Sequence, residues 1–118
     1  MAYGFPKKSR LLEPAEFKAV FDGASVKVSS RYFLILGRPA ERDGARMGMV
    51  VGKKNIARAV NRNRLKRLIR EFFRHQLAAS PGLDLVVLVR KDADTLSNPE
   101  IRQALQKLWQ DLLRKCPA

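Results

Sequence analysis

The sequence has few of the residues that build disulfides, metal centres or histidine-based catalysis. Its 118 residues include one cysteine, Cys116, and one histidine, His75. A single cysteine excludes an intrachain disulfide and suits a reducing compartment. The two residues together fall short of the four ligands of a structural zinc site, and His75 has no obvious partner for general-base catalysis. We therefore expect no protein metal site and no catalytic residue.

Long hydrophobic runs are also lacking. The longest apolar segment, at 83–89, contains Asp84 and is far too short to span a bilayer. Residues 1–12 include basic side chains with no apolar stretch behind them, so we expect no signal peptide. These features predict a cytoplasmic protein without a membrane partner.

Acidic residues are scarce relative to basic ones. The chain has 24 lysines and arginines against 11 aspartates and glutamates, which gives a formal net charge of +13. Such an excess attracts phosphate, so nucleic acid is the leading candidate partner and an anionic membrane surface is the weaker one. The acids do not suggest a nuclease, because Asp84, Asp92 and Asp94 flank one strand without the second acidic cluster of a two-metal site.

What the sequence does contain is a regular succession of helix and strand patterns. An apolar content of 46% fits one domain, residues 1–118, with a hydrophobic core. Ser97 and Glu100 have the spacing of a capping box. Periodicity predicts an α+β fold in the order αβββαβα. The elements are a helix at 14–22, strands at 25–29, 31–37 and 47–51, a turn at 38–46, a helix at 58–78, a strand at 83–90 and a helix after Ser97, preceded by a flexible basic arm at 1–10.

The most informative stretch is NRNRLKRLIREFFR, from Asn61 to Arg74. At 100° per residue it divides into an apolar face and a cationic face. The apolar face comprises Leu65, Leu68, Ile69, Phe72 and Phe73. The opposite face comprises Asn63, Lys66, Arg67, Arg70 and Arg74. Such a helix buries one side and presents cations on the other.

The charged residues of this segment are mostly of one sign. Residues 53–74 contain nine lysines or arginines and one acid, Glu71. Solvated helix faces usually mix both signs, because like charges four residues apart repel. A ladder of one sign runs through Arg62, Lys66, Arg70 and Arg74. The ladder predicts a polyanionic ligand, and the planar guanidinium groups suit bidentate phosphate contacts.

Asn63 has two interpretations that the sequence does not separate. It is a mediocre helix former and could have a capping or surface role near the helix start. Its amide could equally reach an RNA group or a hydrated metal ion.

The stretch KKNIARAVNRNRLKRLIREFFR resembles the signature of the protein component of bacterial ribonuclease P. The signature is the triplet Arg62-Asn63-Arg64, followed by Leu65 and the pair Lys66-Arg67. Other segments are similar to that family in the expected order, namely SRLLEPAEFKAVFDG, RMGMVVGKK and DLVVLVR. The resemblance implies a single compact α+β domain with a four-stranded sheet packed by helices. It also implies a left-handed β-α-β crossover, although crossovers are usually right-handed.

The same resemblance implies that the chain is the protein cofactor of a ribozyme. The RNA subunit, acting with Mg²⁺, would hydrolyse the phosphodiester bond that releases the 5′ leader of precursor tRNA. The protein would bind this catalytic RNA and the precursor tRNA, and would have no small-molecule substrate. The residues implied for the catalytic RNA are Lys53, Lys54, Arg58, Arg62, Asn63, Arg64, Lys66, Arg67 and Arg70. The alternative is a structural RNA-binding protein, such as a ribosomal component, without a role in cleavage.

The family's leader cleft lies between the first helix and the sheet. Its helix wall corresponds to Phe17 and Phe21, and its sheet wall to Tyr32, Leu34 and Leu36. Leu36 departs from family members that have an aromatic residue there. From the residues alone, two aromatics four apart on a short helix are more often core residues. The resemblance makes stacking on single-stranded RNA an equal alternative.

Overall fold

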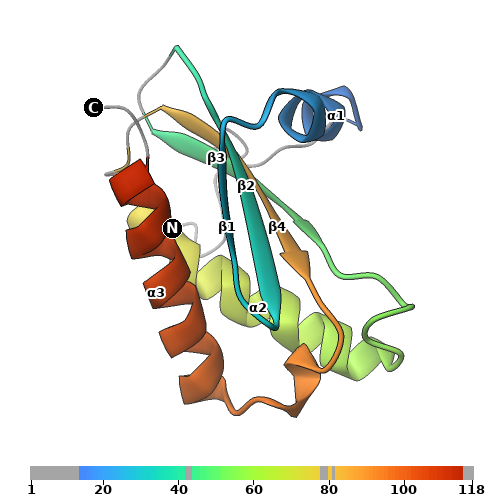
Figure 1. Cartoon of the computed structure of the whole chain (residues 1–118). Helices are drawn as coiled ribbons and strands as arrows, with labels where there is room; N and C mark the ends of the chain where they lie inside the picture. The colour runs from blue at the N-terminus through green and yellow to red at the C-terminus, as the bar shows by residue number, and fades with distance from the viewer. Residues whose placement is uncertain (1–13, 42–43, 78–79, 81, 116–118) are drawn as a thin grey trace, which may run out of the picture.

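The computed structural model describes residues 14–41, 44–77, 80 and 82–115 (Figure 1). The predicted basic arm at 1–10 and Cys116 lie outside these residues. The described chain contains three α-helices, four strands and one short 3₁₀ turn. They are α1 (Pro14–Gly23), β1 (Val26–Ser29), β2 (Phe33–Pro39), β3 (Ala45–Val50), α2 (Ala59–Gln76), β4 (Leu83–Val89), η2 (Ala93–Thr95) and α3 (Asn98–Lys115). The predicted order αβββαβα is confirmed, and η2 is an addition that the periodicity did not predict.

The second strand and the turn after it differ from the prediction. β2 begins at Phe33 rather than Arg31, because the Ser30 hydroxyl accepts hydrogen bonds from the backbone N–H groups of Tyr32 and Phe33, both at 3.3 Å. These bonds hold a turn between β1 and β2. The loop predicted at 38–46 is shorter, because β2 continues to Pro39 and β3 already starts at Ala45.

The four strands form one mixed sheet in the order β1-β2-β4-β3. β1, β2 and β4 pair antiparallel, whereas β3 pairs parallel to β4. α2 therefore connects two neighbouring parallel strands, as the β-α-β crossover requires. Its left-handed sense stays a prediction from the family resemblance.

α2 and α3 cover one face of the sheet and enclose the main hydrophobic core (Figure 1). The α2 stripe is confirmed at Leu65, Leu68, Ile69 and Phe73, which are all buried, whereas Phe72 is only half-buried. Phe73 packs edge-to-face against Trp109 of α3, with 5.5 Å between the ring centroids.

The predicted capping box at the start of α3 is also confirmed. The backbone N–H of Ser97 donates to Glu100 Oε1 at 2.9 Å, and the N–H of Glu100 donates to Ser97 Oγ at 3.3 Å. The described residues thus form one compact α+β domain, in which α1 alone lies on the second face of the sheet (Figure 1).

Candidate nucleic-acid interface

α2 presents its cations on the side opposite the buried stripe. Arg67 and Arg70 are exposed, and Lys66 and Arg74 are partly exposed. We call these four residues the cationic ridge. Their placement follows from helix geometry, because the apolar positions that α2 buries leave the ridge positions facing solvent.

Arg62 of the signature triplet stabilises the segment that precedes α2 by hydrogen bonds to its backbone. Its guanidinium group donates to the backbone carbonyl oxygens of Ile56 at 2.9 Å and Ala57 at 2.8 Å. Ile56 is fully buried and anchors the same segment. The side chain that the sequence assigned to RNA therefore already has a structural partner.

Arg64 ties α2 to the start of α3. It donates to Asn98 Oδ1 at 2.9 Å and to the carbonyl oxygen of Leu96 at 2.6 Å. Beside it, Asn61 Nδ2 donates to Asp94 Oδ2 at 3.0 Å. Direct RNA contacts by Arg62 and Arg64 stay predictions, but sequence reasoning missed their structural bonds. The acceptors of Arg64 lie more than 30 residues away and give no local signal.

Asn63 is exposed on α2, close to the cationic ridge. The helix starts at Ala59, and its N-cap residue is Arg58, which makes no side-chain capping bond. Asn63 is the fifth helical residue, so the capping role considered from the sequence is wrong. Two interpretations remain, namely a plain surface role and a contact of the exposed amide with an RNA group or a hydrated metal ion.

Lys53, Lys54 and Arg58 are exposed on the segment between β3 and α2. A tight turn shapes this segment, because the N–H groups of Asn55 and Ile56 both donate to the carbonyl oxygen of Gly52. The Asn55 side chain also donates to the carbonyl oxygen of Val89 at 3.1 Å, which joins the turn to the end of β4.

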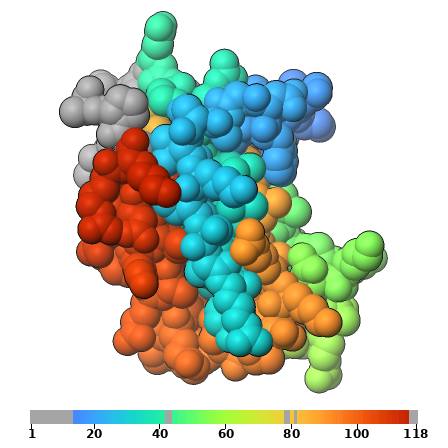
Figure 2. Space-filling view, in the orientation of Figure 1, coloured from blue at the N-terminus to red at the C-terminus, as the bar shows by residue number. Residues whose placement is uncertain are grey.

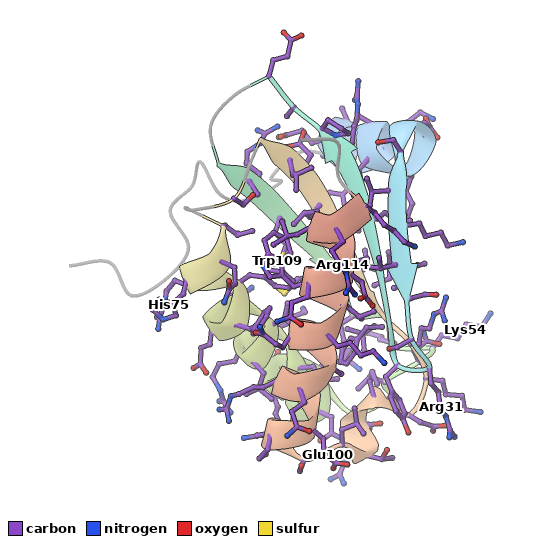
Figure 3. The ribbon with its side chains drawn as sticks, turned by 60° about the vertical axis from the view of Figure 1, so that its left-hand side comes forward. Arg31, Lys54, His75, Glu100, Trp109 and Arg114 are labelled. Atoms are coloured by element: carbon purple, nitrogen blue, oxygen red, sulfur yellow. The ribbon has the colours of Figure 1, made fainter. Side chains whose placement is uncertain are left out.

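Arg31 is a further cation that the sequence analysis did not single out. Figure 3 shows Arg31 and Lys54 at the same end of the molecule. Arg31 is exposed in the turn between β1 and β2, and its guanidinium carbon lies 5.4 Å from the centroid of the Tyr32 ring. Arg90 stabilises this turn by donating to the carbonyl oxygen of Ser30 at 2.8 Å.

On the second face of the sheet, Phe17 packs directly on Gly48. A Cβ atom added to Gly48 would lie 2.4 Å from Phe17 Cζ, so only glycine leaves room for this ring. Gly48 aligns with Val86 of β4 and Leu36 of β2 across the sheet. A small cluster forms here from Val20, Val86, Phe17, Leu36 and Leu88. Phe17 therefore has a packing role, and Leu36 lies beside it.

Phe21 is more open than Phe17. It follows Phe17 by one helical turn, so both side chains lie on the same side of α1. The exposed fraction of Phe21 is 45%, which leaves much of its ring accessible. Of the two aromatics, Phe21 is the one with free surface for stacking.

The row of sheet residues next to Gly48, Val86 and Leu36 is less covered by α1. The strand register aligns four residues on this face, which we call the open row: Ser29, Leu34, Leu88 and Val50. Leu34 and Leu88 are half-buried, and the exposed fraction of Val50 is 38%. Figure 2 shows a recess on this side, between α1 and the segment that follows β3.

Tyr32 does not belong to this wall. It precedes β2 and packs against the main core between the sheet, α2 and α3, whereas Leu36 packs in the α1 cluster. Tyr32 stands before the first residue of β2, so the alternation assumed for residues 32–36 does not fix the direction of its side chain. Leu34 and Leu36 are the members of the predicted sheet wall that share the α1 face.

An ionic network fixes α1 over the sheet. Arg46 Nε donates to Asp84 Oδ1 at 3.2 Å, and Arg46 Nη1 makes an ion pair with Glu16 Oε2 of α1 at 2.5 Å. The hydrogen bond to Asp84 raises the pKa of Arg46, opposed by desolvation. Arg46 links α1, β3 and β4.

Two further observations concern metals and membranes. Among the residues that the structure describes, no three histidine, cysteine, aspartate or glutamate side chains cluster as a metal site would require. None of the described helices combines the length and hydrophobicity of a bilayer crossing.

Comparisons with known proteins agree with this fold. Residues 5–113 match the family model described as Ribonuclease P. The ribonuclease P protein component of Pseudomonas paraeruginosa is 49% identical over 113 residues, which cover 96% of this chain and 84% of the relative. The protein component of Azotobacter vinelandii is 47% identical over 113 residues, covering 96% and 87%.

Solved structures give the same result. The RNase P protein of Staphylococcus aureus superposes with a TM-score of 0.81 at 27% identity, covering 89% of this chain and 97% of that chain. The RNase P protein of Thermotoga maritima gives a TM-score of 0.72 at 28% identity, covering 92% and 98%.

Proposed function

This chain belongs to the family of ribonuclease P protein components, subunits of a tRNA-processing endoribonuclease, and from this premise we propose that it binds the catalytic RNA and the 5′ leader of precursor tRNA. In this proposal the RNA subunit performs the endonucleolytic hydrolysis, and the protein alone is not a catalyst. The proposal places the chain in the bacterial cytoplasm, where precursor tRNA is made.

The cationic ridge is the single observation that carries the proposed RNA contact. Lys66, Arg67, Arg70 and Arg74 share the outer side of α2, and Glu71 is the only acid between residues 53 and 74. Binding of phosphates would relieve the repulsion within the ridge and release counterions from the RNA. The exposed side chains of Lys53, Lys54 and Arg58 extend this surface beyond the start of α2.

The recess beside α1 supports the proposed leader contact. Phe21 offers an exposed ring, and the open row offers a shallow apolar floor at Leu34 and Leu88. Single-stranded RNA binds by stacking its bases on aromatic side chains near cations. Phe17 contributes through its packing on Gly48, which holds this end of α1 close to the sheet.

Mg²⁺ belongs to the RNA in this proposal. The ion supplies Lewis-acid chemistry at the scissile phosphate when it is bound by the ribozyme. A direct protein site fits poorly near Asn63, because the surrounding cations would repel a divalent ion. The exposed Asn63 amide suits a hydration water of such an ion or an RNA group.

Reconstitution tests the proposal. The protein is mixed with a ribonuclease P RNA at low Mg²⁺, and cleavage of precursor tRNA is measured together with the affinities for precursor and mature tRNA. We expect faster cleavage and a preference for the precursor. Unchanged cleavage would favour the structural RNA-binding alternative, and cleavage by the protein without RNA would refute the division of labour.

A further inference from the structure

A groove of about 570 Å³ runs between the outer surfaces of α2 and α3, beside the cationic ridge. Its lining includes Phe72, His75, Gln76, Gln103, Gln106 and Gln110. These residues comprise all four glutamines of the chain and its only histidine. Figure 3 shows His75 on the outer side of α2. The concentration of one residue type at one place calls for an explanation.

The groove combines a fixed aromatic ring with neutral hydrogen-bonding groups. Phe72 is half-buried and packs edge-to-face on the core residue Phe73, with 5.0 Å between centroids. Gln103, Gln106 and Gln110 recur at helical spacing and therefore lie along one face of α3. Each glutamine amide offers both a donor and an acceptor. This is the pairing that a nucleobase edge presents.

Charge favours RNA as the occupant. Arg102 and Lys107 line the α3 side of the groove, and Glu71 is the only acid in its lining. Residues of α2 can be ordered around the helix axis at 100° per residue. In this order the ridge residues Arg74 and Arg67 come first, and the groove residues Glu71, His75 and Phe72 come next. An RNA backbone that lies on the ridge would therefore run alongside the groove.

We propose that the α2–α3 groove binds an unpaired nucleobase of the RNA whose backbone lies on the cationic ridge. The base contacts the Phe72 ring, the glutamine amides hydrogen-bond its edge, and Arg102 and Lys107 contact the adjacent phosphates. Proteins commonly read unpaired RNA bases in this way, by aromatic contact and by hydrogen bonds to the base edge. The groove has the size of a small-molecule pocket, roughly 300–1,000 Å³. This inference rests on the proposed RNA-binding function.

The four glutamines provide a direct reporter. The full chain is labelled with ¹⁵N-glutamine, so that every side-chain amide signal comes from the groove. It is titrated with single-stranded oligoadenylate and with an abasic ribose-phosphate oligomer of the same length. We expect saturable shifts of these signals with oligoadenylate and much smaller shifts with the abasic oligomer. Equal shifts with both oligomers would refute recognition of a base.

Two variants separate the groove from the ridge. The double variant Gln103→Ala with Gln106→Ala alters exposed helix positions where alanine is well tolerated. It should weaken the oligoadenylate affinity read from Gln76 and Gln110 by about fivefold to tenfold, as loss of one or two hydrogen bonds predicts. Lys66→Ala should weaken the binding of both oligomers to the same extent.

The outcomes also distinguish a failure of the groove proposal from a failure of the proposed RNA-binding function. If both oligomers bind the protein but the glutamine signals do not move, RNA binding stands and the groove proposal is wrong. If neither oligomer binds and the catalytic RNA does not bind either, the proposed function fails together with the groove.

Discussion

Replacing Gly48 with alanine should weaken leader binding indirectly, by displacing the Phe17 ring that packs on Gly48. The added Cβ would lie 2.4 Å from Phe17 Cζ and 2.6 Å from Cε1, whereas ordinary contact begins at 3.4 Å. The ring must therefore retreat by about 1.0 Å, the difference between these two distances. Arg46 holds α1 through Glu16, so the displacement falls mainly on the ring and on its neighbours in the α1 cluster.

The cost follows from overpacking. Such insertions typically destabilise by about 1–3 kcal/mol. Phe17 is half-buried, so its ring can move partly towards solvent, and we expect the lower part of that range, about 1–2 kcal/mol. Leader affinity should fall by about tenfold, since base–aromatic contacts contribute roughly 1–3 kcal/mol each. Affinity for mature tRNA, which lacks the leader, should stay unchanged.

Urea unfolding and binding of precursor and mature tRNA measure these effects. Gly52→Ala is the matched control, because a Cβ at Gly52 meets no atom within 4 Å. A double-mutant cycle with Phe17→Ala tests the cause: Gly48→Ala should cost little once the ring is gone. Equal effects of Gly48→Ala and Gly52→Ala, or additive costs in the cycle, would refute the reasoning.

Four other predictions concern α2, α1 and α3. Arg64→Ala should destabilise the fold by about 1–3 kcal/mol in thermal or urea unfolding, because it removes the link to α3. Arg67→Ala should leave stability nearly unchanged and reduce the salt slope of RNA affinity by about one; the reverse pattern would contradict both assignments. Phe21→Ala should weaken precursor binding by about tenfold without loss of stability, and a loss of stability instead would mean that its ring is core. Hydrogen bonds from Ser97 lower the pKa of Glu100. The contribution of the Glu100 carboxylate to stability is therefore present above the usual glutamate pKa and lost as pH falls through the lowered value. Glu100→Gln should weaken the loss of helix stability at acid pH, measured by circular dichroism, and an unchanged loss would show that the cap does not titrate.

Much of the fold could be predicted because local patterns report local burial. The spacing of Leu65, Leu68, Ile69 and Phe73 gave the buried side of α2, and the near-continuous apolar run at 83–89 gave a strand buried by helices on one face and α1 on the other. Periodicity did not predict that β2 begins only at Phe33, because a single serine hydroxyl shapes the turn before it.

The sequence by itself determined that α2 would carry cations opposite an apolar stripe, because both faces are encoded at helical spacing within one segment. Only the tertiary structure decided which cations remain available: Arg62 and Arg64 donate to carbonyl and amide oxygens of other segments, while Arg67 and Arg70 face solvent. Likewise, the sequence placed Gln103, Gln106 and Gln110 along one face of α3, and the packing of α2 against α3 brought Gln76 beside them in one groove. Periodicity records how a segment meets the core, whereas contacts between distant segments depend on how the chain folds in three dimensions.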